Sequence, residues 1–479
     1  MNMKHSIIAL SIAAIFAPLL PSHADEMQDI RNEIKAIKEG YEVRLQALED
    51  RLKEAEVKTQ KAEDSAAKAE TAAQRAASAP QTKQTSSQNA ANPGIGLILS
   101  GFYKNLSQDP ESYRIAGFMP SGDIGPGNRG FSLAESELSF SANIDHYFYG
   151  QLTASLTPEN TVAVEEAFFK TLSLPAGLSL KGGRFFSGIG YLNEVHAHAW
   201  DFVDQPLAYQ AFLGSQYGQN GLQLKWLAPT PLFLEFGVEA GNGQNFPGLA
   251  RNKNGTNGGA IFGHVGGDLG DSASWRAGLS YLYHRVKGRE IADESGNFGA
   301  VVNGFDGKSK LMIADAVLKW APNGNSTDTS LKIQAEYFKR KENGDLVFDT
   351  AGDVTLNPFA GTASAFSSAQ SGWYVQSVYQ FAPQWRAGLR YDELRSGAPN
   401  IGLIGQTDVA SGVLISDDDF SDLKKYNPKR LSAMIDWSPS EFSRIRLQYA
   451  QDKARRDVTD NQFFVQYIYS LGAHGAHKY

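Results

Sequence analysis

The chain has 479 residues, of which 42% are hydrophobic, 11% aromatic and 20% charged, with 47 glycines and no cysteine. The lack of cysteine excludes disulfides, thiolate metal sites and cysteine nucleophiles, and a single short apolar run excludes a polytopic helical membrane protein. A net charge of −7 argues against non-specific binding to nucleic acid. A large β-rich soluble protein or a transmembrane β-barrel remains, because barrel strands need not be hydrophobic on average.

The first 24 residues have the organisation of a secretory signal peptide. Lys4 precedes an apolar run at 6–20, and the small residues Ser22 and Ala24 follow at the spacing of a cleavage site. The run is shorter than the roughly 20 apolar residues that span a bilayer. We therefore expect a signal peptide at 1–24 and export, with cleavage before Asp25.

Residues 25–79 predict an α-helical coiled coil. Apolar residues recur at steps of three and four from Met27 to Ala76, charges of both signs fill the other positions, and proline is absent. We expect this helix to form a homotrimer, with weak association in its alanine-rich second half. The following stretch, 80–94, is rich in Gln, Ser, Thr and Asn, which predicts a flexible linker.

Residues 95–479 predict an all-β fold, a transmembrane antiparallel β-barrel of about 16 strands (16 to 18). Apolar and polar residues alternate along many segments, and this alternation alone does not separate a membrane barrel from a soluble sandwich. The sixteen expected strands are 96–104, 131–144, 147–157, 162–172, 178–186, 219–227, 232–240, 260–269, 273–286, 309–320, 330–340, 372–381, 385–395, 428–437, 443–453 and 461–471.

The connections between these segments favour the membrane barrel. Joints after even-numbered strands are mostly short, such as Asp145-His146, and several joints after odd-numbered strands are long: 105–130, 187–218, 341–371 and 396–427. Short turns on one rim and long loops on the other are typical of outer-membrane barrels. An even number of strands places both ends of the barrel on the periplasmic rim, so we expect the coiled coil in the periplasm.

If the apolar side chains face lipid, the alternate residues line the lumen. The basic residues expected there are Arg276, Lys332, Arg386, Arg390, Arg430, Arg444 and Arg446. Earlier strands turn acidic residues inward: Glu135, Glu137, Glu235 and Glu239. Opposed walls of opposite sign would favour polar solutes and set ion selectivity. The alternative is that these are ordinary solvated residues with local ion pairs.

The connection 187–218 is expected to fold inside the barrel, because its aromatic content suits a packed loop more than one in solvent. Its acidic residues, expected to face the arginines at a constriction, are Glu194, Asp201 and Asp204. His196 and His198 lie two residues apart with carboxylates nearby, so they form a candidate zinc site. The alternative is a buried histidine paired with a carboxylate.

The sequence does not predict an enzyme, because it contains no P-loop, no Gly-x-Ser-x-Gly elbow and no His-Glu-x-x-His motif. Apart from the candidate zinc, no cofactor is expected. About 385 barrel residues cannot supply both the roughly 22 strands and the plug domain of an energised receptor, whereas 16 to 18 strands enclose an aqueous lumen. The expectation is therefore a passive pore in the outer membrane of a Gram-negative bacterium.

The chain resembles the trimeric porins of Gram-negative bacteria, loosely the phosphate-selective O/P type, and its coiled coil is similar to that of sugar porins that carry one. Three stretches more specifically resemble proteobacterial outer-membrane proteins labelled zinc-regulated: 183–202, 436–444 and 470–477. That resemblance implies that the protein takes part in zinc uptake or acts as a receptor. Many such proteins carry a His-rich outer loop, which 287–308 lacks.

Three functions are therefore expected, in this order. The first is a passive diffusion channel for small hydrophilic solutes or ions, embedded in outer-membrane lipid. The second is a zinc-linked channel or a receptor for metal uptake. The third is a structural envelope tether that acts through the coiled coil.

Overall fold

The computed structural model describes residues 93–121, 124–158, 160–248 and 254–472, together with Gln46 and Lys53, which are helical. The signal peptide, the rest of the predicted coiled coil and the linker up to residue 92 lie outside the described residues. The chain divides into two units, 1–86 and 87–479, and the second is considered below. No helix among the described residues is long and apolar enough to cross a bilayer.

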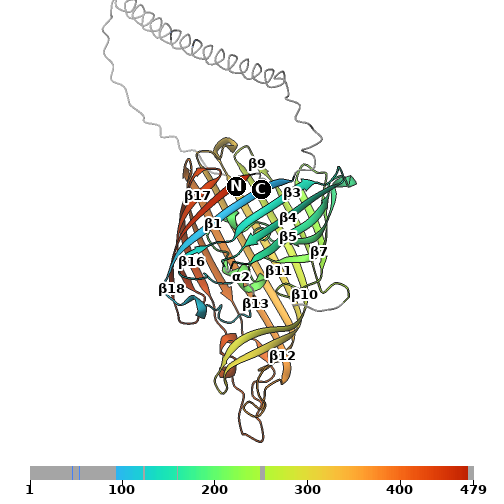
Figure 1. Ribbon diagram of the computed structural model, residues 1–479, viewed down its shortest axis with the longest axis vertical. Helices are drawn as coiled ribbons and strands as arrows, with labels where there is room; N and C mark the ends of the chain where they lie inside the picture. Colours follow the sequence, from blue (N-terminus) through green and yellow to red (C-terminus); the bar gives the residue numbers. More distant parts are fainter. Residues whose placement is uncertain are drawn as a thin grey trace, which may run out of the picture. The chain divides into compact units, whose positions relative to one another are not determined.

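Sixteen antiparallel strands close into a barrel, as the alternation predicted (Figure 1). Consecutive strands pair along the chain, and β1 pairs with both β18 and β3, which closes the ring. These strands are β1 (Gly94–Leu106), β3 (Ser136–Asn143), β4 (Phe148–Leu156), β5 (Val162–Thr171), β6 (Leu178–Phe186), β7 (Gly218–Leu227), β8 (Phe233–Gly241), β9 (Gly258–Leu269), β10 (Ala273–Ser295), β11 (Gly299–Trp320), β12 (Ser330–Val347), β13 (Ala363–Ala382), β14 (Trp385–Arg395), β16 (Lys429–Ser440), β17 (Ser443–Lys453) and β18 (Asp460–Gly472).

Two short strands and several helical turns complete the described residues. β2 (Gly130–Leu133) pairs with β1 in line with β3, and β15 (Asn400–Ile401) pairs with β13. The helix α2 (Leu207–Leu213) lies in the connection between β6 and β7. The 3₁₀ turns are Pro110–Ser112, Pro175–Gly177, Ala197–Ala199, Pro322–Gly324 and Asp417–Leu423.

The two rims of the barrel differ as the sequence predicted. Turns on one rim are short, down to the two residues 383–384 between β13 and β14, whereas the other rim carries long connections such as 107–129 and 396–428. Gly96 pairs with Gly472, so both ends of the barrel strand set lie on the short-turn rim.

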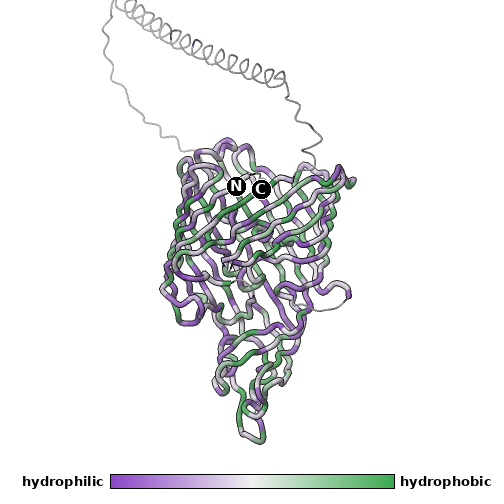
Figure 2. The backbone as a smooth tube through the Cα atoms, viewed as in Figure 1, coloured by the Kyte–Doolittle hydropathy of each residue, from purple (hydrophilic) through white to green (hydrophobic). Residues whose placement is uncertain are grey.

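The outer surface of the barrel is apolar. Large apolar side chains point outward from strand after strand, and Leu279 and Leu389 are 69% and 62% exposed. Hydropathy alternates along the strands accordingly (Figure 2). At the short-turn rim Trp385 and Trp437 stack with ring centroids 6.0 Å apart, as expected of an aromatic girdle at a lipid–water interface. Such a surface is stable in a bilayer and not in water.

Strands β10 to β13 run further than the sequence predicted and project beyond the long-loop rim (Figure 1). The expected strand ends at 286, 309, 340 and 372 lie inside longer strands. Beyond the apolar band both faces of a strand meet water or protein, so the lipid-facing alternation that marked the strands is lost there. The projection has its own apolar core, which includes Phe305, Phe348, Leu403 and Phe420.

A buried ion pair lies inside this projection. Arg289 on β10 donates to both carboxylate oxygens of Glu342 on β12 at 2.8 Å, and the two side chains are at most 1% exposed. The ring of Phe305 lies 4.9 Å from the Arg289 guanidinium. The buried Arg340 Nε also lies 3.7 Å from Glu342 Oε2, so one carboxylate compensates two guanidinium groups in an apolar interior.

We predict that Glu342→Leu lowers the free energy of unfolding by about 3–5 kcal/mol, because it leaves Arg289 and Arg340 buried without their carboxylate. The triple variant R289M/R340M/E342L should recover most of this loss, because well-packed apolar residues often replace a buried ion pair or triad at little cost. Denaturant unfolding of the barrel in lipid vesicles measures both values. A triple variant as unstable as the single one would show that the charged triad itself is required.

Candidate functional site

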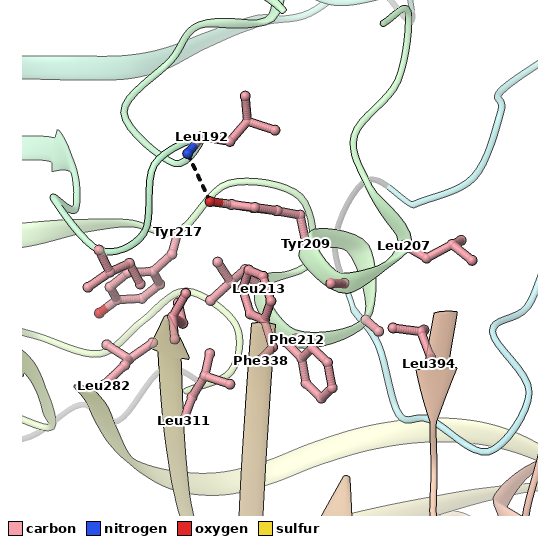
Figure 3. Close-up of a cluster of buried hydrophobic side chains, with 14 of the residues drawn as sticks. Leu192, Leu207, Tyr209, Phe212, Leu213, Tyr217, Leu282, Leu311, Phe338 and Leu394 are labelled. Carbon is pink, nitrogen blue, oxygen red and sulfur yellow. Dashed lines mark hydrogen bonds between the residues drawn. The ribbon is translucent and has the colours of Figure 1, made fainter. Parts of the chain in front are cut away.

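The connection between β6 and β7, residues 187–217, folds into the lumen and is named the constriction loop here. Its helix α2 is fully buried and packs against inward-facing side chains of the wall, including Leu282, Leu311, Phe338 and Leu394 (Figure 3). Tyr337, the neighbour of Phe338 on β12, is by contrast 45% exposed on the outside. Because neighbouring residues of a strand face opposite sides, the loop lies inside the barrel.

A buried carboxylate on β12 holds the start of the loop. Glu336 accepts hydrogen bonds from the backbone N–H groups of Tyr191 and Leu192 at 3.1 and 3.2 Å, and from the hydroxyl of Tyr209 at 3.0 Å. The hydroxyl of Tyr374 donates to it as well, at 2.5 Å. A carboxylate with four donors is a fixed anchor for a loop. The sequence did not identify Glu336 as a functional residue, because nothing in its pattern distinguishes it from the other acidic residues that face the lumen.

Two of the three predicted loop carboxylates meet the predicted basic residues. Lys332 Nζ donates to Asp201 at 2.9 Å, and Arg386 Nη1 donates to the same carboxylate at 3.4 Å. Asp204 lies 2.8 Å from Arg390 Nη2 and 2.7 Å from Arg430 Nη1. These contacts join the loop to β12, β14 and β16, and the basic partners are named the basic wall.

The basic wall keeps both loop aspartates ionised. Burial alone would raise the pKa of Asp201, but the charges of Lys332 and Arg386 outweigh it and hold the pKa well below its usual range. The same balance, with Arg390 and Arg430 as the cations, lowers the pKa of Asp204. The loop is therefore held by charge that persists in acid.

The other predicted basic residues take different roles. Arg446 donates to the backbone carbonyl of Trp200 at 2.8 Å, and Arg276 donates to that of Gly190 at 3.3 Å. Arg444 differs, since no described residue hydrogen-bonds its buried Nε or Nη1. The basic wall is thus neutralised jointly by the loop aspartates and by Asp436 and Asp392 on its own strands.

Glu194, the third predicted acidic residue of the loop, does not reach the basic wall. Its carboxylate lies 3.7 Å from Lys181 Nζ on β6 and 3.4 Å from Lys225 Nζ on β7. It therefore fastens the loop to the strands from which the loop emerges.

The two loop histidines lie among three glutamates on the opposite wall. His196 Nδ1 is 3.1 Å from Glu165 Oε2 and 3.2 Å from Glu137 Oε2, and its Nε2 is 3.2 Å from Glu166 Oε2. His198 Nδ1 is 2.8 Å from Glu137 Oε1. Burial lowers the pKa of His196, but the three carboxylates overcome this and hold it well above its usual value. These five residues are named the carboxylate–histidine cluster.

A β-bulge explains how two consecutive residues of β5 enter the same cluster. Thr153 on β4 pairs with Glu166 and the next residue, Ala154, pairs with Val164, so Glu165 is the extra residue. In a regular strand Glu165 and Glu166 would face opposite sides of the barrel, whereas the bulge turns both inward. Sequence reasoning placed Glu137 in the lumen but missed these two, because a bulge leaves no mark in the alternation.

Two cavities meet the constriction loop from opposite rims. One, of about 280 Å³, opens among the short turns and is lined by Ser440, Arg444 and His198. The other, of about 170 Å³, lies toward the long loops and is lined by Pro126 and Asp204. The loop segment from His198 to Asp204 borders both cavities, with His198 at the larger one and Asp204 at the smaller one.

The chain is distantly similar in sequence to one protein and in backbone structure to several others. No family model matches the chain. A protein of Aquifex aeolicus (strain VF5), described only as uncharacterized, is 29% identical over 426 residues, which cover 82% of this chain and 81% of the relative.

Three solved structures illustrate the similarity in architecture. A loop-deletion mutant of OmpT, an outer-membrane protein of Vibrio cholerae, has a TM-score of 0.48 and 12% identity, over 80% of this chain and all of that one. OprB of Pseudomonas putida has a TM-score of 0.46 and 14% identity, over 81% and 96%. An anion-selective porin of Comamonas acidovorans has a TM-score of 0.45 and 9% identity, over 79% and 99%.

We predict that replacing both Asp201 and Asp204 with Asn releases the segment between the cavities. Lys332 would lose its ion-pair partner, while the arginines would each lose the loop carboxylate and keep Asp436 or Asp392 on the wall. Breaking a buried pair from one side costs about 3–5 kcal/mol. Single-channel conductance should therefore rise and become noisier. The matched control is Asp353→Asn, on an exposed loop, which should leave the conductance unchanged. An unaltered conductance in D201N/D204N would contradict the constriction.

Asp201 and Asp204 also determine how acidic the solution must be before the constriction loop is released. The pKa of each carboxyl is lower in the folded protein than in the unfolded chain, where it is about 3.9. Each carboxylate therefore contributes its full stabilisation above about pH 3.9, and this contribution is lost as the pH falls through the folded pKa. Conductance recorded from pH 7 downward should therefore stay constant to about pH 4 and rise only in stronger acid. D201N/D204N should lack this transition. Release near pH 5 in the wild type would contradict the assignment.

Proposed function

We propose that the protein is an outer-membrane channel for the passive diffusion of small hydrophilic solutes or ions. The observation that carries this proposal is the polar lumen of the closed barrel, with a cavity on each side of the charged segment from His198 to Asp204. The larger cavity is lined mainly by polar and charged residues, which a purely structural barrel does not need, because apolar side chains would fill its interior more stably. The segment acts as the constriction that limits solute size.

The lumen favours anions on the short-turn side. Arg444 borders the larger cavity, and its Nε and Nη1 have no hydrogen-bond partner among the described residues. Arg386 borders the same cavity, although its charge is shared with Asp201 and Asp436 at 3.4 and 2.6 Å. Glu441, on the exposed turn after β16, lines the same cavity. The expected preference for anions therefore rests on Arg444, a guanidinium with two nitrogens that no acceptor among the described residues reaches.

Recording the purified full-length protein in a planar bilayer under a KCl gradient tests this function. Stable open steps with a reversal potential on the anion side are expected. Arg444→Gln should shift the permeability ratio toward cations by about fivefold, since a unit charge 4 Å from an ion in water is worth about 1 kcal/mol. No current from correctly folded protein would contradict the channel.

The matched control for the selectivity change is Arg395→Gln. Arg395 is the last residue of β14, at the long-loop rim and away from the cavity that Arg444 borders. Its side chain is 64% exposed and pairs with Glu393 at 3.1 Å. R395Q should keep the wild-type reversal potential. An equal shift in both variants would mean that total charge, and not the guanidinium at the cavity, sets the selectivity.

Two further expectations stay predictions. The homotrimer is tested by chemical cross-linking of the protein in native membranes, where a three-fold mass is expected. The envelope tether is tested by deleting 25–79, which should leave channel current intact if the barrel is the functional part.

A further inference from the structure

The carboxylate–histidine cluster contains more negative charge than the fold of the loop requires. Glu137, Glu165 and Glu166 converge on one imidazole, and their side chains are only 5–10% exposed. The carboxyl of Glu135 also comes within hydrogen-bonding range of Glu165. Buried carboxylates repel one another unless cations or metals compensate them.

One carboxylate oxygen lacks a donor of the usual kind. Glu165 Oε1 is buried on a side chain that is nine-tenths buried, and no N–H or hydroxyl group among the described residues reaches it, so only the neighbouring Glu135 carboxyl lies in range of this carboxylate. A buried acceptor without a donor costs about 1–3 kcal/mol. The bulge that turns Glu165 inward is therefore unfavourable for folding alone, and bulges of this kind commonly aim a side chain into a site.

The spacing of the ligand atoms fits a divalent transition metal. His196 Nδ1 lies 3.2 Å from Glu137 Oε2 and 3.1 Å from Glu165 Oε2, and one ligand atom from each residue lies within 4.8 Å of the others. Ligands about 2.0 Å from a tetrahedral Zn²⁺ are about 3.3 Å apart. Small movements of the carboxylates would complete the geometry.

The surrounding contacts match those of known metal ligands. A metal-bound imidazole usually donates its other N–H to a carboxylate, and His196 Nε2 lies 3.2 Å from Glu166 Oε2. Ligating carboxylates are themselves hydrogen-bonded, and His198 Nδ1 holds the other oxygen of Glu137 at 2.8 Å. His198 is thus assigned to orientation, whereas the sequence prediction placed it among the ligands.

We propose that Glu137, Glu165 and His196 bind one divalent transition-metal ion at the wall of the lumen, with Glu166 and His198 orienting the ligands. A mixed set of one nitrogen and two oxygen donors suits Zn²⁺ and its neighbours better than Ca²⁺, which takes six to eight oxygens. Since His196 belongs to the constriction loop while the glutamates belong to β3 and β5, the ion joins the loop to the wall opposite the basic wall. The site goes beyond the proposed channel and does not depend on its selectivity.

Isothermal titration of the full-length barrel in detergent with ZnCl₂ tests the site. One ion per chain is expected to bind at the cluster, and Ca²⁺ at the same concentration should not displace it. Glu165→Gln should weaken zinc binding by at least about tenfold. This variant keeps an oxygen acceptor for His196 and removes one charge from crowded carboxylates, so circular dichroism should show a folded barrel.

Matched variants separate this site from other ligands. His196→Gln should weaken zinc binding as E165Q does, whereas His264→Gln should not, although His264 also lies in the lumen and pairs with a glutamate, Glu235, at 3.1 Å. X-ray absorption of the zinc complex should show one imidazole and oxygen ligands at about 2.0–2.2 Å.

Three results would overturn the proposal. They are an absence of zinc binding to folded wild-type protein, equal binding of Ca²⁺, and zinc binding that survives E165Q but is lost in H474Q/H477Q, which removes the two tail histidines. Channel recordings without zinc are independent of all three, so a failed metal site leaves the proposed channel open to its own test.

Discussion

The structure depends on the pairing of buried charge between the constriction loop and the barrel wall. Asp201 and Asp204 are buried carboxylates on a loop, which is tolerable only because cations of the wall meet them at 2.7–3.4 Å. Lys332 has Asp201 as its ion-pair partner, whereas Arg386, Arg390 and Arg430 also pair with Asp436 and Asp392 on the wall itself. The loop carboxylates therefore depend on the wall more than the wall depends on the loop, and these pairs hold the loop across the lumen. The position of the loop then determines where the two cavities lie.

The barrel itself could be predicted from the sequence because its signals are local and periodic. Leu389 and Leu431 face lipid while Arg390 and Arg430 face the lumen, and this alternation follows from the strand geometry alone. The even number of strands and the unequal rims follow from turn lengths. The sequence did not predict the extensions of β10 to β13 beyond the membrane. These extensions lack the apolar outer face by which the other strands were identified.

The site could be predicted only in part, for a physical reason. The aromatic residues of the constriction loop predicted that it folds inside the barrel. The opposite charges of its carboxylates and the wall predicted that Asp201 and Asp204 pair with the arginines. Glu194 instead pairs with Lys225 beside its own strands, because several inward cations compete for each carboxylate. Glu165 entered the lumen through a bulge, and a bulge depends on the register of two strands that a single sequence does not specify.

The constriction loop is attached to the two walls of the lumen by groups of opposite charge. The basic wall offers permanent charges that hold Asp201 and Asp204 over a wide pH range, and Glu336 adds neutral donors from Tyr209 and Tyr374. The opposite wall offers an excess of carboxylates around His196, whose charge the proposed metal ion would neutralise. A rigid attachment on one side and a cation-sensitive one on the other would let an ion influence the constriction without rearranging the barrel.

Thiol labelling of a buried loop position tests the central claim most directly, since the native chain has no cysteine. Ala208 on α2 is fully buried, so the variant Ala208→Cys should resist a membrane-impermeant thiol reagent, while Ser411→Cys on an exposed loop should react at once. In the D201N/D204N background the thiol of A208C should become reactive. Prompt labelling of A208C in the otherwise native barrel would show that the loop is not held in the lumen.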